Sequence, residues 1–322
     1  MLLCPAFGDS GKYSGLMKKI LVLHYSQTGQ LSRFVGSVMK PLEECPTVEV
    51  IYQTLKPKVA YPFPWPIFSF FSIFPETVAM LPPEMEALDI DLDTDFDLVI
   101  LAYQVWFLSP SLPTTGFLKS QAAKKLLQNR PVITLIGCRN MWLMAQEKVK
   151  TELDRLNAQL IDCAVLTDQC SAAMSFLSTP LWMFTGKKQA VSWIPKAGID
   201  DNEIQNASRF GQAIINRIAN STEEPFSKPI FTGLGAVKIN DKLIASEKIG
   251  HRSFTIWGKL MRILGPQSSL RRKCGLIFYM VFLILIILTV VPITALLRTL
   301  FAPLTKSKTQ ALKAYYAAPS GE

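Results

Sequence analysis

The chain has 322 residues, of which 49% are hydrophobic, so it can hold one large domain or two small ones around a sizeable core. Its net charge is +9, but the basic residues cluster towards the C-terminal third, and neither zinc-finger spacing nor an RNP-like aromatic motif occurs. This pattern argues against a nucleic-acid partner. Two histidines are too few for a histidine-rich metal site, and six scattered cysteines without a Cys-x-x-Cys pair favour a reducing compartment.

The first residues, 1–17, have neither the charged start nor the long apolar region of a secretory signal. Met17 stands directly before Lys18, Lys19 and the first apolar run. We therefore expect Met17 to be the natural start and the residues before it to be an upstream extension.

An apolar run over residues 20–25, too short for a helix of its own, predicts the first strand. An amphipathic helix pattern follows over 30–39, and the turn between them has the sequence Ser26-Gln27-Thr28-Gly29-Gln30-Leu31. Such an arrangement binds anions, because free backbone N–H groups and the helix dipole point at one place. The turn lacks the lysine of a P-loop and the three glycines of the dinucleotide fingerprint. An ordinary strand-to-helix turn capped by Ser or Thr is the alternative.

Strands and helices then alternate, which predicts an α/β fold with a doubly wound, five-stranded parallel sheet and helices on both faces. We expect the strand order 2-1-3-4-5. The further strands are expected at 48–53, 98–103, 132–136 and 160–166, and the further helices at 114–127, 142–156 and 201–219.

Two more loops follow strands of this predicted sheet. One continues from Tyr103 through Gln104, Val105, Trp106 and Phe107, and the other contains Gly137, Cys138, Arg139 and Asn140. Ligands in open α/β sheets bind outside the carboxyl ends of the strands, where the strand order reverses. The sequence therefore predicts that both loops and the Ser26–Leu31 turn meet at one site.

An aromatic and proline-rich insertion at 56–83 interrupts the pattern, and its prolines prevent a continuous helix at its start. One interpretation is a wall over the site that takes a long apolar substrate, formed by Phe63, Trp65, Phe68 and Phe71. The other is extra core packed on the sheet. A second apolar segment at 171–193 can reach the same mouth, although core packing suits its individual Met and Phe residues better.

No charged residue occurs over 274–297, a length that suffices to cross a bilayer, so we expect a transmembrane helix there. Basic residues at 271–273 give a modest bias towards a cytoplasmic N-terminal side. Residues 221–273 are expected to be a linker with a short amphipathic helix at the membrane interface, and 298–322 a basic tail. The helix face would hold Trp257, Leu260, Met261 and Leu264; packing on the domain is the equal alternative.

The turn at Ser26, Thr28 and Gly29 resembles the FMN phosphate loop of the flavodoxin-like family, roughly Ser/Thr-x-Thr-Gly-x-Thr, with Leu31 replacing the last hydroxyl. Longer strings, such as the one from His24 to Leu31, resemble a branch associated with dialkylresorcinol and flexirubin-type lipid biosynthesis. The resemblance covers residues 18–220. It implies FMN as cofactor, bound by Ser26, Gln27, Thr28, Gly29, Gln30, Leu31, Tyr103, Gln104, Val105, Trp106, Phe107, Gly137, Cys138, Arg139 and Asn140.

Proteins of that branch are described either as condensing or as aromatising enzymes. A condensing enzyme needs an activated thiolate with a positioned base, and only His24, inside a strand, and His251 are available. We therefore favour FMN-dependent dehydrogenation of a cyclic dione to a resorcinol. Catalytic roles would fall to Tyr103, as a proton relay, and to Arg139, which could hold an enolate or carboxylate or else form a structural ion pair.

Two other functions stay open at this point. One is an NAD(P)H-dependent quinone reductase, and the other is a non-enzymatic electron carrier or scaffold at the membrane. Val105, Trp106 and Phe107 favour an apolar ligand over a carrier role. The expected partners are an apolar small molecule, the lipid bilayer, and a second copy or biosynthetic partner enzymes.

Overall fold

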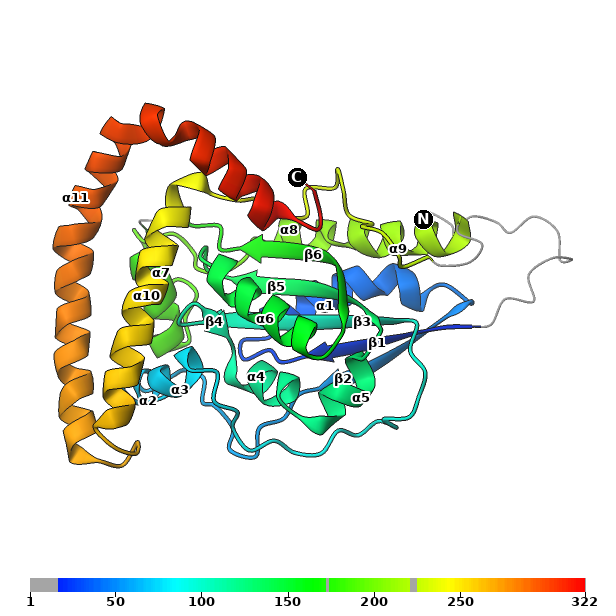
Figure 1. Ribbon diagram of the computed structural model, residues 1–322, viewed down its shortest axis with the longest axis horizontal. Coiled ribbons are helices and arrows are strands. Elements are labelled where there is room, and N and C mark those ends of the chain that lie inside the picture. The colour runs from blue at the N-terminus through cyan, green and yellow to red at the C-terminus, as the bar shows by residue number, and fades with distance from the viewer. Residues whose placement is uncertain (1–16, 172–173, 221–224, 322) are drawn as a thin grey trace, which may run out of the picture.

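The computed structural model describes residues 17–171, 174–220 and 225–321, so the extension expected before Met17 lies outside the described residues. Its centre is a parallel sheet in the order β2-β1-β3-β5-β6 (Figure 1). Counted along the chain, these five strands have the expected order 2-1-3-4-5. The α/β prediction with a doubly wound sheet is therefore confirmed. The strands are β1 (Lys18–His24), β2 (Val48–Thr54), β3 (Leu98–Trp106), β5 (Pro131–Cys138) and β6 (Gln159–Thr167).

Helices cover both faces of the sheet, and this explains why its central strands are continuous apolar runs. Residues 98–103 of β3, for example, are all fully buried. A two-residue strand, β4 (Ser109–Pro110), folds back antiparallel onto the end of β3. On one face lie α1 (Gln30–Glu43), α8 (Asp201–Asn206) and α9 (Ser208–Asn220); on the other lie α4 (Leu112–Leu118), α5 (Gln121–Leu127) and α6 (Leu143–Arg155) (Figure 1).

The helix expected over 114–127 is in fact two helices. The break lies between Leu118 and Gln121, where the Ser120 hydroxyl accepts the N–H of Ala123 and starts α5. Serine competes for backbone groups in this way and favours the first position of a helix over its interior. The helix expected over 201–219 is likewise divided, into α8 and α9.

The aromatic insertion forms two short helices, α2 (Ile67–Ser72) and α3 (Phe74–Val78), at the carboxyl edge of the sheet. A third helix at this edge, α7 (Ser175–Thr185), comes from the second apolar segment. Figure 1 shows these helices gathered where β1, β3 and β5 end.

The stretch expected to be a linker contains a 23-residue helix, α10 (Asp241–Ile263), which packs against α3 and α6. Gly258 lies at this contact, where a Cβ would meet Val78 of α3 at an ordinary packing distance of 3.6 Å. The expected shared face is only partly right. Met261 is buried and Trp257 and Leu264 pack beside it, but Leu260 is 42% exposed on the other side.

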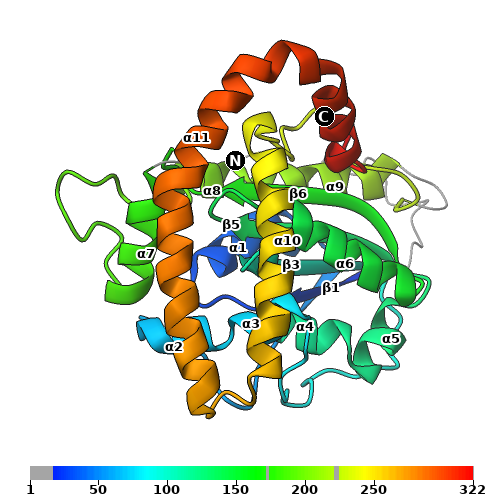
Figure 2. The ribbon, with the colours of Figure 1, turned by 60° about the vertical axis from the view of Figure 1, so that its left-hand side comes forward.

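The last helix, α11, runs over 48 residues from Leu270 to Ala317. Its segment Leu270–Val290, with a mean hydropathy of 2.5, is long and apolar enough to cross a membrane by length and composition. It runs beside α10, and its C-terminal turns then bend back to the domain (Figures 1 and 2). The part expected to be a basic tail is thus largely helical. It ends on β6, where the Ser320 hydroxyl donates to Asp162 Oδ1 at 2.7 Å.

Candidate functional site

The turn after β1 has the geometry of an anion site. Gly29 has a φ of +78°, and no side chain caps the N-terminus of α1. The Ser26 hydroxyl oxygen is buried without a hydrogen-bond partner among the described residues. A helix start leaves its first N–H groups unpaired, and a buried hydroxyl without a partner is costly. An oxyanion seated here would satisfy both.

A cleft of about 150 Å³ opens beside this turn at the carboxyl ends of β1, β3 and β5. Its lining contains eleven of the predicted cofactor or wall residues: Gln27, Thr28, Gln30, Leu31, Phe63, Gln104, Val105, Trp106, Gly137, Cys138 and Arg139. The structure adds Asp168, Gly198 and Ile199, which were not predicted there. It also adds Thr179, Trp182 and Met183, which belong to the segment at 171–193 that could reach this mouth. The topological switch point therefore brings all three predicted loops together.

Gln30 has a different role from the one expected. Its amide nitrogen donates to the Ile199 carbonyl at 3.1 Å, and its amide oxygen accepts the Ile199 N–H at 3.3 Å. Gly198, with a φ of +99°, has no room for a Cβ, which would lie 2.5 Å from the Gln30 amide oxygen. Gln30 therefore fastens the loop before α8 to the start of α1, and its side chain is not free to bind a ligand.

Tyr103 does not reach the cleft. Its side chain is fully buried in the core, where its hydroxyl donates to Gln146 Oε1 at 2.6 Å. The Gln146 amide nitrogen donates in turn to the Thr134 hydroxyl at 2.9 Å. Burial raises the pKa of Tyr103 well above its ordinary value. The structure thus corrects the prediction of a proton relay, because this phenol is a buried structural group.

Phe107 and Asn140 also lie apart from the cleft lining. Phe107 has a φ of +48°, and the turn directs its ring towards Phe70, with ring centroids 4.5 Å apart. The Asn140 amide donates to the Ser175 hydroxyl at the start of α7. Both residues support the surrounding helices, which is a correction to their expected contact with a cofactor.

Arg139 has the features of an anion-binding cation. Its guanidinium lies 4.2 Å from the centre of the Phe176 ring, and burial lowers its pKa. The nearby Asp168 carboxylate instead accepts the N–H groups of Gly198 and Cys170, each at 2.7 Å. Among the described residues, Arg139 has no ion pair, so its charge is available to a ligand in the cleft.

The expected aromatic wall is only partly at the cleft. Phe63 lines it and meets Trp182 of α7 edge-on, with ring centroids 6.0 Å apart. Trp65 is buried behind the lining, 5.8 Å from Trp106. Phe68 and Phe71 lie on α2 outside the lining. The mouth is instead covered by α7, which is held there by the backbone N–H of Trp65 donating to the Met183 carbonyl at 2.9 Å.

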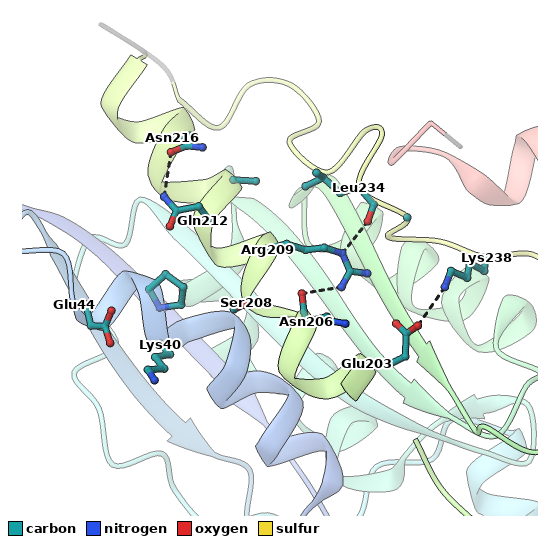
Figure 3. Close-up of a pocket in the computed structure, with 13 residues that line it drawn as sticks. Lys40, Glu44, Glu203, Asn206, Ser208, Arg209, Gln212, Asn216, Leu234 and Lys238 are labelled. Atoms are coloured by element: carbon teal, nitrogen blue, oxygen red, sulfur yellow. Dashed lines mark hydrogen bonds and ion pairs between the residues drawn. The ribbon is translucent and has the colours of Figure 1, made fainter. Parts of the chain in front are cut away.

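A larger hollow of about 890 Å³ lies between α9 and the end of α1 remote from the turn (Figure 3). Its polar groups largely bind one another. Arg209 donates to the carbonyls of Leu234 and Asn206, and Lys238 pairs with Glu203 at 3.5 Å. It is wide, far from the strand ends and without an unpaired buried group among the described residues, so it is a weaker candidate than the cleft.

No protein-family model and no curated protein sequence matches the chain. Among solved structures it is similar to a flavoprotein in complex with FMN from Lactobacillus acidophilus NCFM, at 16% identity and a TM-score of 0.38, over 46% of this chain and 93% of that one. It is also similar to a flavodoxin from the domain Archaea, at 11% identity and a TM-score of 0.37, over 63% and 100%. The strand order, rather than these scores, defines the flavodoxin-like fold of the chain, with the cleft at the switch point between β1 and β3.

Proposed function

We propose that this chain is an FMN-binding oxidoreductase that acts on an apolar cyclic ketone or phenol at a membrane. The observation that carries the proposal is the buried, unpartnered Ser26 hydroxyl beside the uncapped start of α1. These groups lie at the switch point of a sheet with the flavodoxin strand order.

The residues of the turn fit a phosphate monoester. The hydroxyls of Ser26 and Thr28 and the N–H groups of the first turn of α1 would supply neutral donors, and the left-handed Gly29 would shape the backbone around an oxyanion. The turn has no cation of its own, which suits a terminal phosphate held by many hydrogen bonds. Leu31 supplies packing where a further hydroxyl would otherwise donate.

The flavin ring would lie between the loop at Gln104–Trp106 and the loop at Gly137–Arg139. The cleft of about 150 Å³ is smaller than the roughly 300 Å³ at which ligand pockets usually begin. Entry of the ring therefore requires Trp182 and Met183 to move outwards with α7. Apart from Ser175 and Ser178, no residue of this helix is buried, which favours such a movement.

When bound, FMN supplies hydride transfer. The substrate, a cyclic dione, would lose two hydrogens, one as a hydride and one as a proton to solvent, and become a resorcinol, with FMN as the oxidant. Arg139 would hold the enolate or phenolate oxygen, because it is a cation without a protein ion pair at the cleft. Phe63, Trp106 and Trp182 would contact the apolar part of the substrate and exclude water from it.

A quinone reductase that uses NAD(P)H is the second candidate, since the same cation and apolar lining suit a quinone. An electron carrier is less well supported, because carriers expose the flavin edge to a protein partner and here Phe63, Trp182 and Met183 cover the mouth. We place the α/β domain on the cytoplasmic side, where FMN and nicotinamide cofactors occur.

The test is a visible absorption spectrum of the purified full chain, before and after incubation with FMN. A flavin spectrum and saturable uptake are expected, and their absence would overturn the proposal. Product analysis then separates the two enzymes. Cyclohexanedione-type substrates should yield a resorcinol without added nucleotide if the first candidate is right, whereas NAD(P)H-dependent quinone reduction would favour the second.

A further inference from the structure

Both ends of α11 are bound to the same domain. Near its start, Arg272 is almost fully buried and donates to both carboxylate oxygens of Glu76 in α3, at 2.7 and 2.5 Å. Near its end, the Tyr315 hydroxyl donates to Glu147 in α6 at 2.7 Å, and Ser320 donates to Asp162 in β6. A helix that crosses the roughly 30 Å of a bilayer core places its ends on opposite sides. One domain cannot hold both of them.

The outward face of α11 is nevertheless apolar. Leu276 and Tyr279 point inwards and are buried, with the Tyr279 ring stacked 4.8 Å from Phe74. Six residues at helical spacing point outwards, and each is more than half exposed: Ile277, Phe278, Val281, Ile284, Leu285 and Leu288. An exposed apolar stripe of this length on a folded domain marks a contact surface.

The exposed side of α10 has apolar and basic residues next to each other. Ile249, Ile256 and Ile263 are each at least 60% exposed. Lys248, Arg252, Lys259 and Arg262 are exposed beside them. A helix with an apolar stripe flanked by lysine and arginine is typical of one that lies in the interface of an anionic membrane.

The net charge of α10 and α11 indicates which partner covers their exposed faces. Residues 248–321 contain eleven basic residues and no acidic one, whereas the rest of the chain has two more acidic than basic residues. A second copy of the chain would bring like charges together on this face. An anionic lipid surface would attract it, at about 1 kcal/mol for each basic residue close to the surface.

We propose that α10 and the outward face of α11 lie in one leaflet of an anionic bilayer, with α11 parallel to the membrane plane and both its ends on the domain side. This replaces the single-pass crossing expected from the sequence. The apolar length of α11, which suggested a crossing, instead serves two faces of one helix. The inner face packs on α3 and α10, and the outer face contacts the leaflet.

This arrangement deepens the proposed function and, for the route of the substrate, rests on it. The two helices stand at the edge of the sheet where β1, β3 and β5 end (Figures 1 and 2). The cleft is lined by residues from the same strand ends. Between them and the cleft loops lies an aromatic layer, in which Phe74 contacts Phe254 at 5.4 Å and Phe107 at 5.2 Å between ring centroids. On the proposed function, an apolar substrate would travel from the leaflet to the cleft along this aromatic layer, whose side chains would have to move to let it through.

Vesicle flotation tests the surface. The full chain should float with vesicles of phosphatidylcholine and phosphatidylglycerol and much less with phosphatidylcholine alone. The double variant Leu285→Lys/Leu288→Lys should lose at least tenfold in binding. Val59→Lys, which changes an aliphatic residue that is 80% exposed elsewhere, should bind like the parent chain. Circular dichroism shows that each variant is folded. Equal flotation of all variants, or loss of a dimer instead of flotation, would overturn the proposal.

Cysteine labelling tests the orientation. Lys308→Cys on α11 and Lys58→Cys on the domain are introduced into a chain whose other accessible cysteines are serine, and inverted membrane vesicles are treated with an impermeant maleimide. Both sites should be labelled without detergent. Labelling of residue 308 only after detergent would show a crossing helix and overturn the proposal. The flavin spectrum of the same samples reports on FMN independently, so failure of the proposed function is recognised separately.

Discussion

The sheet and the C-terminal helices use apolar sequence in opposite ways. In β3 the residues at 98–103 are buried on both faces, because helices cover the sheet on each side. In α11 the equally apolar stretch at 276–288 is buried on one side only, and its other side is open. Apolar content alone therefore does not distinguish a core strand, a crossing helix and a surface helix. The difference depends on what packs against each face, which four changes can test.

The largest effect is expected where the helices are attached. Arg272→Ala leaves the Glu76 carboxylate in a largely buried site without its partner, with side-chain exposures of 2% and 22% for the pair. Breaking a buried pair costs about 3–5 kcal/mol, and the partial exposure of Glu76 favours the lower end. Chemical unfolding in detergent should show this loss. Lys56→Ala, which breaks the exposed pair with Asp89, should cost below about 1 kcal/mol; equal losses would remove the ion pair as the attachment.

The second effect is a pH dependence of the packing of α10. Burial raises the pKa of Glu247 to about 7 from its ordinary 4.5, although the Met144 N–H donates to its carboxylate. Between these values the unfolded chain loses a proton that the folded chain keeps, so the free energy of unfolding falls as pH rises. The fall amounts to about 3 kcal/mol across this window.

Unfolding curves from pH 4 to pH 8 measure the slope of the free energy of unfolding against pH. Glu247→Gln should flatten it, because the amide still accepts from Met144 but does not ionise. Glu203→Gln, at an exposed position, is the matched control and should keep the slope of the parent chain. A parent chain whose stability rises with pH across the window would contradict the assignment to Glu247.

The third change tests how α9 packs against α1 on one face of the sheet. An ideal Cβ on Gly211 in α9 would lie 1.9 Å from the Val38 carbonyl oxygen of α1, so Gly211→Ala must push these helices apart. Overpacking of this kind costs about 1–3 kcal/mol. Gly36 also lies in α1, but a Cβ there would have no heavy atom within 4 Å. Gly36→Ala should therefore stabilise the folded chain by about 0.5–1 kcal/mol. Thermal melting of the two variants should therefore shift in opposite directions, and shifts of the same sign would contradict the packing of α1 on α9.

The last change concerns binding and leaves the fold intact. Thr28→Val removes one hydroxyl from the turn and should weaken FMN binding about tenfold or more, since a hydrogen bond to a charged group contributes about 1.5–3 kcal/mol. Fluorescence titration with FMN measures it. Thr151→Val, an exposed threonine on α6, should leave the affinity unchanged. If Thr28→Val binds FMN like the parent chain, Thr28 is not part of the phosphate site.

Much of the sheet and its covering helices could be predicted, because the sequence patterns that indicate them are local. The buried runs, the helical spacing of Leu31, Phe34 and Val38, and the glycine turn each lie within a few residues. The cleft was predicted less completely. Trp182 and Met183 reach it from α7, and the loop at Ile199 is joined to Gln30 across 169 residues. Tyr103 lies in β3 beside Gln104, yet the alternation of the strand turns its ring into the core.

The sequence by itself determined the elements of the sheet, their order, the uncharged turn with its hydroxyls, and the presence of a long apolar helix. Tertiary structure alone decided that Tyr103 is a core residue, that residues 241–263 are a packed helix and that α11 returns to β6. The physical reason is the range of the interactions. Periodicity and turn chemistry act between neighbours, whereas the Arg272–Glu76 and Ser320–Asp162 contacts join residues 196 and 158 positions apart. No local sequence pattern predicts these two contacts.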